Sequence, residues 1–325
     1  MTKFKLVLLI QSFSLLVISC KKDDSTPKQA QSEPTPRYSF ALAFDDARNK
    51  LILFGGFNSG TLMNDTWEWD GTKWEMKSKS GPSPRNGPAM AYDSKRKKTI
   101  LFGGDAGSLS FGDTWEWDGS EWKLLSSEGP PGRSLHTLDY DAVRDKVVLF
   151  GGINSQITMG DLWEWDGTKW TQVVTTDGPD ARFLHASAYD EQNKKTLIFG
   201  GNALPASTQQ SFRGDLWAWD GSRWEQYSAG GPSPRDHVDM VYDPLKKKLI
   251  VHGGGVPGGA SASDTWEWDG TVWTIRVTNS TAPLEGYKLV YDSKNETVLL
   301  YGGFVGGTPS SSIWKLTTNE WSLIK

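Results

Sequence analysis

The chain contains very little cysteine and histidine. Of its 325 residues, Cys20 is the one cysteine and four are histidines. A single cysteine excludes a disulfide within the chain and any cysteine-based metal site. The formal net charge of −4 gives no basic surplus, so nucleic acid is not an expected partner. We therefore expect neither a bound metal nor a cofactor.

The apolar stretch at the amino terminus is too short to cross a bilayer as a stable helix. It runs over thirteen residues, 6–18, after Lys3 and Lys5, and has the size of a signal-peptide core. The alternative is a short anchor that stays attached. The stretch ends in V-I-S-C at Cys20, which resembles the lipobox of bacterial lipoproteins. That resemblance implies a signal peptide over 1–19, cleavage before Cys20, and acyl chains on Cys20 that hold the protein on membrane lipid.

Residues 21–36 have the composition of a flexible tether. They include three prolines and no aliphatic residue larger than Ala30, so they cannot form a core. The segment K-K-D-D at 21–24 resembles the surface-export signal of lipoproteins from Bacteroidota-type bacteria, although a solvated linker explains it equally well. These resemblances imply a lipid-anchored protein of the bacterial outer membrane, with residues 20–36 as lipidated cysteine and tether.

A Gly-Gly doublet recurs six times in the remaining chain. Successive doublets begin 48, 48, 49, 53 and 49 residues apart, at Gly55, Gly103, Gly151, Gly200, Gly253 and Gly302. Five of the copies continue into W-x-W-D-G-x-x-W, and the sixth keeps Trp314 and Trp321, so that all 17 tryptophans belong to the repeat. A fixed period near 50 residues predicts a propeller or solenoid in which each unit packs on its neighbours.

Each copy reads as four short strands. In the second copy we expect strands over 86–93 and 99–102, a third around Trp115 and Trp117, and a fourth from Trp122. A loop of variable length follows each doublet, and Asp118-Gly119 forms a tight turn. The large apolar area of tryptophan predicts that the tryptophans pack between units, rather than stack on sugars.

The phasing of doublet and tryptophan resembles kelch repeats over residues 37–325. The resemblance implies an all-β fold: a six-bladed kelch-type β-propeller with four antiparallel strands per blade. Each blade is one continuous stretch, and no terminal strand is a candidate for exchange. The protein is expected to be monomeric. The top face then collects the loops after the doublets and the starts of the first strands, while the turns between first and second strands lie on the bottom face.

The starts of the first strands carry arginines with histidines close behind. The resemblance places these residues near the central channel, where an Arg and His ring suits an anionic group such as a carboxylate; they are Arg37, Arg85, Arg133, Arg182, Arg235, His136, His185 and His237. The alternative is that the arginines pair with aspartates at the starts of the third strands: Asp65, Asp113, Asp161, Asp215 and Asp264. The sixth copy has Leu284 and Ser312 at these two positions, which favours pairing.

The sequence favours a binding module over an enzyme. The longest loop after a doublet, 202–214, ends near Phe212 and Arg213, and variable loops on a rigid scaffold commonly recognise ligands. We expect a protein or glycan to bind the top face. Kelch propellers also include a copper oxidase, which the cysteine content excludes, and a sialic-acid epimerase, which remains as the alternative function. A purely structural envelope subunit is a third possibility. No catalytic residues can be singled out.

Overall fold

The computed structural model describes residues 31–155, 157–204, 211–227 and 230–325. Ser32–Lys325 form one compact unit, and Gln31 is the only described residue of the preceding unit. Cys20, the expected signal peptide and most of the expected tether lie outside the described residues. The compact unit includes the last five tether residues, among which Pro34 is buried.

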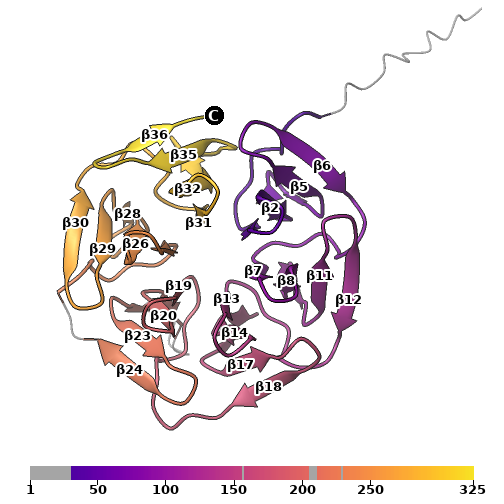
Figure 1. The fold of residues 1–325 in the computed structure, drawn as a ribbon, viewed down its shortest axis with the longest axis horizontal. Helices are drawn as coiled ribbons and strands as arrows, with labels where there is room; N and C mark the ends of the chain where they lie inside the picture. The colour runs from indigo at the N-terminus through magenta and orange to yellow at the C-terminus, as the bar shows by residue number, and fades with distance from the viewer. Residues whose placement is uncertain (1–30, 156, 205–210, 228–229) are drawn as a thin grey trace, which may run out of the picture. The chain divides into compact units, whose positions relative to one another are not determined.

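The compact unit is a β-propeller with six blades, which confirms the fold expected from the repeat. Each blade is a sheet of four antiparallel strands in chain order, and the blades follow one another around a central axis (Figure 1). No helix occurs among the described residues. The innermost strands are β1 (Ala41–Asp45), β7 (Ala89–Asp93), β13 (Thr137–Asp141), β19 (Ala186–Asp190), β25 (Asp239–Asp243) and β31 (Tyr287–Asp292).

The second strands are apolar and buried on both faces. They are β2 (Lys50–Phe54), β8 (Lys98–Phe102), β14 (Lys146–Phe150), β20 (Lys195–Phe199), β26 (Lys248–His252) and β32 (Thr297–Gly302). The third strands are β5 (Thr66–Trp69), β11 (Thr114–Trp117), β17 (Leu162–Trp165), β23 (Leu216–Trp219), β29 (Thr265–Trp268) and β35 (Ile313–Leu316). The outer strands are β6 (Trp74–Ser78), β12 (Trp122–Ser126), β18 (Trp170–Val173), β24 (Trp224–Tyr227), β30 (Trp273–Val277) and β36 (Trp321–Leu323).

The segment after each doublet forms a small hairpin where the sequence predicts only a loop. Each hairpin pairs two strands of two residues: β3 (Phe57–Asn58) with β4 (Thr61–Leu62), β9 (Asp105–Ala106) with β10 (Leu109–Ser110), β15 (Ile153–Asn154) with β16 (Ile157–Thr158), β21 (Asn202–Ala203) with β22 (Ser211–Phe212), β27 (Gly255–Val256) with β28 (Ala260–Ser261), and β33 (Phe304–Val305) with β34 (Thr308–Pro309). Single bridges such as Asn86 to Asp105 join five of these hairpins to the residues before the inner strands, so both lie on the top face.

The inner strands begin later than the sequence predicts. In the second blade, Asn86 makes only a single bridge, Gly87 has a φ of 63°, and β7 starts at Ala89 rather than at residue 86. The φ values at the matching positions Leu135 and Leu184 are also positive, at 57° and 55°. A kink therefore separates the top-face segment from each of these inner strands.

The glycine doublets allow consecutive blades to approach closely. Gly103 and Gly104 have φ values of 70° and 97°. A Cβ on Gly103 would lie 2.6 Å from the carbonyl oxygen of Arg133 in the next blade, and the amide of Gly104 donates to that same oxygen at 2.8 Å. Only glycine combines this backbone conformation with the close contact.

The tryptophans pack at the seams between blades, as expected from their size. Trp170 opens the outer strand of the third blade, stacks edge-on against Phe102 of the second, and donates to Thr114 Oγ1 at 2.8 Å. The middle tryptophan of the cluster is buried in every copy that has it: Trp69, Trp117, Trp165, Trp219 and Trp268. Burial of this aromatic surface, together with aliphatic side chains of the second strands, stabilises the contacts between blades.

The ring closes without an exchanged strand. Inner strand β1 contacts β31, and Trp74 of the first blade packs 5.0 Å from Tyr301 of the last, centroid to centroid. Near the carboxyl end, Lys325 forms an ion pair with Glu33 at 2.9 Å and lies over the ring of Trp69. Side-chain packing replaces the main-chain pairing that other propellers use at this seam.

Candidate functional site

The arginines expected on the top face are buried ion-pair partners. Their side chains are 0–1% exposed, and each one lies 2.5–2.7 Å from an aspartate at the start of the third strand in its own blade. The pairs are Arg37–Asp65, Arg85–Asp113, Arg133–Asp161, Arg182–Asp215 and Arg235–Asp264. These are the pairs that the sequence suggested as the alternative to a ligand-binding ring of arginines.

Each pair is a bidentate clasp with further hydrogen bonds. In the third blade, Arg133 donates to both carboxylate oxygens of Asp161, and also to the carbonyl oxygens of Gly151 and Pro131. Trp163 donates to the same carboxylate at 2.7 Å. Burial opposes ionisation of Asp161, but these hydrogen bonds and the Arg133 charge outweigh it and lower its pKa. Four of the five guanidinium donor positions of Arg133 are thereby occupied.

The sixth blade replaces the clasp with a hydroxyl. Trp314 Nε1 donates to Ser312 Oγ at 2.9 Å, where the other blades offer a carboxylate, and Ser310 contacts the same hydroxyl at 2.8 Å. Leu284 supplies only its backbone carbonyl, which accepts from Gly254. The two charges have been lost together, which avoids an unpaired buried ion.

The three candidate histidines occupy two different environments. His136 and His185 lie at blade seams, edge-on to Phe102 and Phe150. Burial and a nearby arginine lower the pKa of His136 to about 3 and that of His185 well below its usual value, so both rings are neutral. His237 is 42% exposed at the top face, and a hydrogen bond to Asp236 raises its pKa against the effect of burial. The structure nevertheless brings the three to one place, because His136, His185 and His237 all line a small cavity toward the top face.

The last two candidates lie beside a top-face hairpin. Phe212 belongs to β22 and is half-buried. Arg213 forms an ion pair with Asp180 at 3.1 Å. Its backbone amide donates to the carbonyl of Gly201, and its carbonyl accepts from the amide of Arg235 at the start of the next blade. As ligand-binding residues, these two and the arginines and histidines above stay a prediction.

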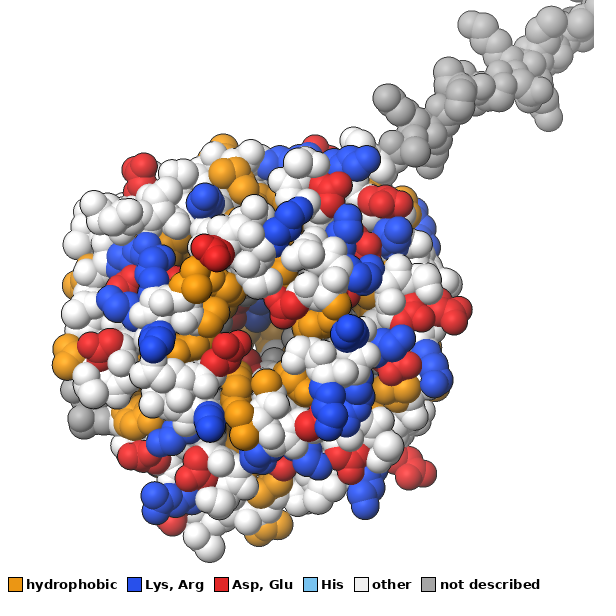
Figure 2. Space-filling view, viewed as in Figure 1, with side chains coloured by type: hydrophobic (Ala, Val, Ile, Leu, Met, Phe, Trp, Pro, Cys, Tyr) orange, Lys and Arg blue, Asp and Glu red, His pale blue; other side chains and the backbone are white. Residues whose placement is uncertain are grey.

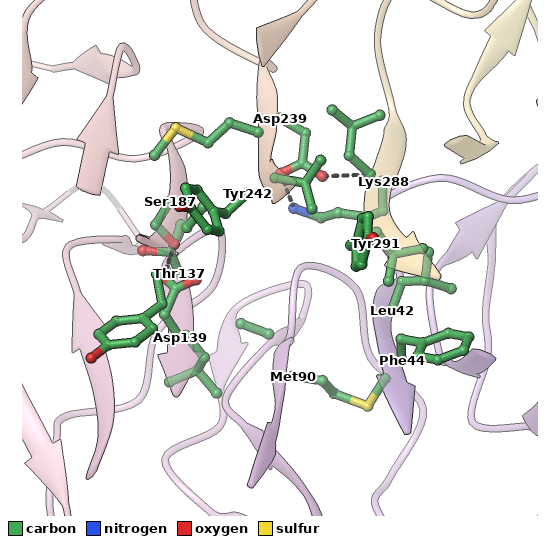
Figure 3. A pocket seen from close by; sticks show the side chains of 18 of the residues that line it. Leu42, Phe44, Met90, Thr137, Asp139, Ser187, Asp239, Tyr242, Lys288 and Tyr291 are labelled. Atoms are coloured by element: carbon green, nitrogen blue, oxygen red, sulfur yellow. Dashed lines mark hydrogen bonds and ion pairs between the residues drawn. The ribbon is translucent and has the colours of Figure 1, made fainter. Parts of the chain in front are cut away.

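A large cavity lies in the central channel and extends to the bottom face. It has a volume of about 580 Å³ and is lined by side chains of all six inner strands (Figure 3). Asp46, Glu191, Pro244 and Ser293, in turns after the inner strands, line its mouth. A second cavity of about 70 Å³ lies toward the top face and shares Pro88, His136 and Lys288 with the first. The two cavities therefore lie in series along the channel.

Two polar pairs project into the main cavity from opposite sides of Figure 3. Ser187 of β19 donates a short hydrogen bond to Asp139 of β13. Asp239 of β25 lies 3.4 Å from Lys288 of β31 and accepts from the backbone amide of Leu289 at 2.7 Å. The remaining lining is largely apolar or aromatic, with Leu42, Phe44, Met90, Tyr242 and Tyr291 labelled around it.

The channel carboxyls are held in a poorly solvated environment. Burial, reinforced by the charge of Asp239, raises the pKa of Asp139 to about 7, despite the Ser187 hydrogen bond and the Lys288 charge. Burial also raises the pKa of Asp239. Groups whose pKa values are displaced in this way, in a concave site, are typical of binding and catalytic centres.

The mouth of the cavity is also acidic. Asp46 and Glu191 are exposed, but partial desolvation and neighbouring carboxylates raise the pKa of both, even though Ser293 donates to Asp46 at 2.6 Å. Figure 2 shows acidic and hydrophobic side chains around the central opening of one face. Four carboxyl groups and one lysine thus line the cavity: Asp46, Asp139, Glu191, Asp239 and Lys288.

The charged residues of the channel were not among the candidates expected from the sequence, although the repeat contains a signal for them. The inner strands carry small residues at the matching channel positions Ala41, Ala89 and Ala186, where the fifth and sixth blades have Asp239 and Lys288. Two residues further along, Ala43, Ala91 and Ala188 match Asp139. A charged residue at an otherwise small, inward-facing repeat position indicates a role that packing does not require.

The described residues hold no cluster of three or more metal-ligating side chains. Among them there is also no helix long and apolar enough to cross a membrane. The site can therefore be described by its carboxyl, hydroxyl, imidazole and amine groups, which accept and donate hydrogen bonds in a partly enclosed space.

Comparison with known proteins identifies the fold but no family. No protein-family model matches the chain, and no curated protein matches its sequence. A solved structure described as "Structure of YjhT" is similar, with a TM-score of 0.70 and 16% sequence identity, over 90% of this chain and 98% of that chain. At this identity the similarity shows a shared fold alone.

Proposed function

We propose that this protein is a saccharide-binding module whose ligand enters the central cavity from the bottom face. The observation that carries the proposal is the meeting of Asp139, Ser187, Asp239 and Lys288 in a cavity of about 580 Å³. Pockets for small ligands have volumes of roughly 300–1,000 Å³ and combine apolar walls with a few convergent polar groups.

The lining suits a sugar better than a flat protein surface. Hydroxyl groups of a saccharide both donate and accept hydrogen bonds, as the cavity's carboxyl, hydroxyl and amine groups do. Phe44, Tyr242 and Tyr291 offer apolar and aromatic surface beside them. A protein partner would need a much larger contact area than the walls of this cavity provide.

The alternative of an enzyme acting on an anionic sugar has less support. That expectation depended on free arginines near the axis, and in this fold the five guanidinium groups bind aspartates. The cavity instead presents four carboxyl groups and one lysine, which would repel an anionic ligand.

The cellular setting belongs to the same proposal. The lipobox-like end at Cys20 and the signal-peptide-like stretch before it support a lipoprotein of the bacterial outer membrane. The phased doublets and tryptophans support repeats of the kelch type. Such a protein would present the propeller to saccharides at the envelope, through a tether over residues 20–36.

A glycan array tests the proposal when the full chain, in detergent, is compared with two variants. Ala89→Phe adds an aromatic ring at a channel-lining position that matches Asp239 and Lys288, and should abolish binding. His237→Ala alters the second cavity, toward the top face, and should leave binding in the main cavity unchanged, because His237 does not line it. Binding that survives Ala89→Phe and fails in His237→Ala would place the site on the top face instead, and an array without any bound saccharide would overturn the proposed function.

A further inference from the structure

The charges of the central cavity do not balance. Lys288 is the one cation among its described lining residues, and its ion-pair partner is Asp239. No described lysine or arginine forms an ion pair with Asp139, whose hydrogen-bond partner is the Ser187 hydroxyl. Asp139 is thus a half-buried carboxyl group with no cation of its own, and burial favours its protonated form. A cationic ligand beside it would favour the carboxylate and form the ion pair that the cavity does not supply.

An unpartnered imidazole lies at the inner end of the same cavity. His136 is 5% exposed, and neither of its ring nitrogens has a hydrogen-bond partner in good geometry among the described residues, although the backbone of Phe102 lies near enough to affect its pKa. Its ring is neutral because burial and the Arg133 charge lower its pKa to about 3. A neutral imidazole has one nitrogen that can accept a hydrogen bond. A buried polar group without a partner calls for an explanation, and a ligand supplies one.

The groups that remain available are mainly acceptors. Asp139 and His136 accept, the hydroxyls of Thr137 and Ser187 do both, and Lys288, the obligate donor, is bound to Asp239. An ammonium group carries three donors and no acceptor, together with the positive charge that Asp139 lacks. The acidic mouth would also attract a cation toward the channel.

We infer that the saccharide bound in the central cavity carries a free amino group, and that its ammonium form binds beside Asp139. This inference rests on the proposed function and makes it more specific. An acetylated amino group has one donor, no charge and a bulky acyl cap, so acetylation should remove the advantage. A neutral sugar should keep only the hydroxyl contacts.

The test compares trisaccharides of glucosamine, N-acetylglucosamine and glucose by titration calorimetry with the full chain in detergent. The glucosamine trimer should bind roughly 10- to 100-fold more tightly than the other two, the range expected for a hydrogen-bonded charge. Asp139→Asn should remove most of that preference and leave the glucose affinity nearly unchanged. Asp236→Asn, which removes a carboxylate at the top face, is the matched control and should keep the preference.

The outcomes separate the amino-group inference from the proposed function. If the three trimers bind equally, or if Asp139→Asn keeps the full preference while its circular dichroism and melting match a folded propeller, the amino-group inference is wrong and saccharide binding stands. Asp239→Asn, which alters the other polar pair, is the second variant for the case that Asp139→Asn fails to fold. If no trimer binds and the array is also silent, the proposed function itself is wrong.

Discussion

Arg133 holds both carboxylate oxygens of Asp161, at 2.5 Å through Nη1 and 2.8 Å through Nη2. The same guanidinium reaches the Gly151 carbonyl at 3.0 Å, so one side chain ties together the first, second and third strands of its blade. Five blades repeat this clasp and the sixth lacks it.

Removing one partner of the clasp should destabilise the propeller strongly. Arg133→Ala leaves Asp161 partly buried without its cation, and we expect a loss of about 3–5 kcal/mol in the free energy of unfolding by urea. The double variant Arg133→Leu with Asp161→Ser copies the sixth blade and should recover part of that loss. Equal stability of Arg133→Ala and the unaltered chain would contradict a structural role for the pair.

The seam tryptophans give a second stability prediction. Trp170 is 8% exposed, packs on Phe102 and donates to Thr114, so Trp170→Ala should cost about 3–5 kcal/mol. Thr114→Val removes the hydroxyl alone and should cost about 1 kcal/mol. Thermal unfolding of both variants measures the two losses of stability. A Trp170→Ala variant as stable as Thr114→Val would show that packing at this seam contributes little to stability.

The stability of the protein should depend on Asp139 in alkaline solution. Its folded pKa of about 7 lies above the ordinary 3.8, so its contribution favours folding at low pH and is lost as the pH rises through 7. Asp139→Asn should therefore be more stable than the unaltered chain at pH 8, by about 1–3 kcal/mol, with a gap that closes toward pH 4. Lys288, Asp239 and Ser187 face the same carboxyl and remain in both proteins.

The stability of Asp139→Asn is also the folding control for the calorimetric binding experiment. A variant that is at least as stable as the unaltered chain cannot lose ligand affinity through unfolding. Urea titrations at pH 5 and pH 8 give the measurement. A gap of equal size at both pH values would show that Asp139 does not titrate between them, and that its environment is better solvated than its burial indicates.

Lipidation of Cys20 can be tested independently of the propeller. The full chain expressed in a bacterial host should partition into the detergent phase, and Cys20→Ala should move to the aqueous phase because it carries no acyl chains. A Cys20→Ala protein that stays with the detergent would favour an uncleaved amino-terminal anchor.

The fold could be predicted from the sequence because its constraints repeat. A doublet such as Gly103-Gly104 is required wherever the next blade approaches, and a seam tryptophan such as Trp170 is required wherever two blades meet. Six copies of each gave the blade number and the strand order. The pairing of Arg133 with Asp161 was also readable as one of two alternatives, because both partners are absent together from the sixth copy.

The candidate site could not be predicted in the same way. Position in the repeat placed His136 near the channel, and its ring does line both cavities there. That the ring also packs against Phe102 at a blade seam could not be predicted, because this contact depends on the neighbouring blade. The polar character of the cavity comes from Asp139, Asp239 and Lys288, each of which occurs in only one blade. Sequence features that recur in every repeat do not reveal such residues. The short hairpins after the doublets were missed because two-residue strands leave no periodic pattern.

The most direct test of saccharide binding in the channel is a crystal structure of the full chain with a saccharide that binds on the array. We predict the sugar in the central cavity, between the inner strands that carry Asp139 and Lys288, with an amino group within about 3 Å of Asp139, the distance of a charge-assisted hydrogen bond. A saccharide bound to the top-face hairpins, with the central cavity empty of sugar, would contradict this prediction.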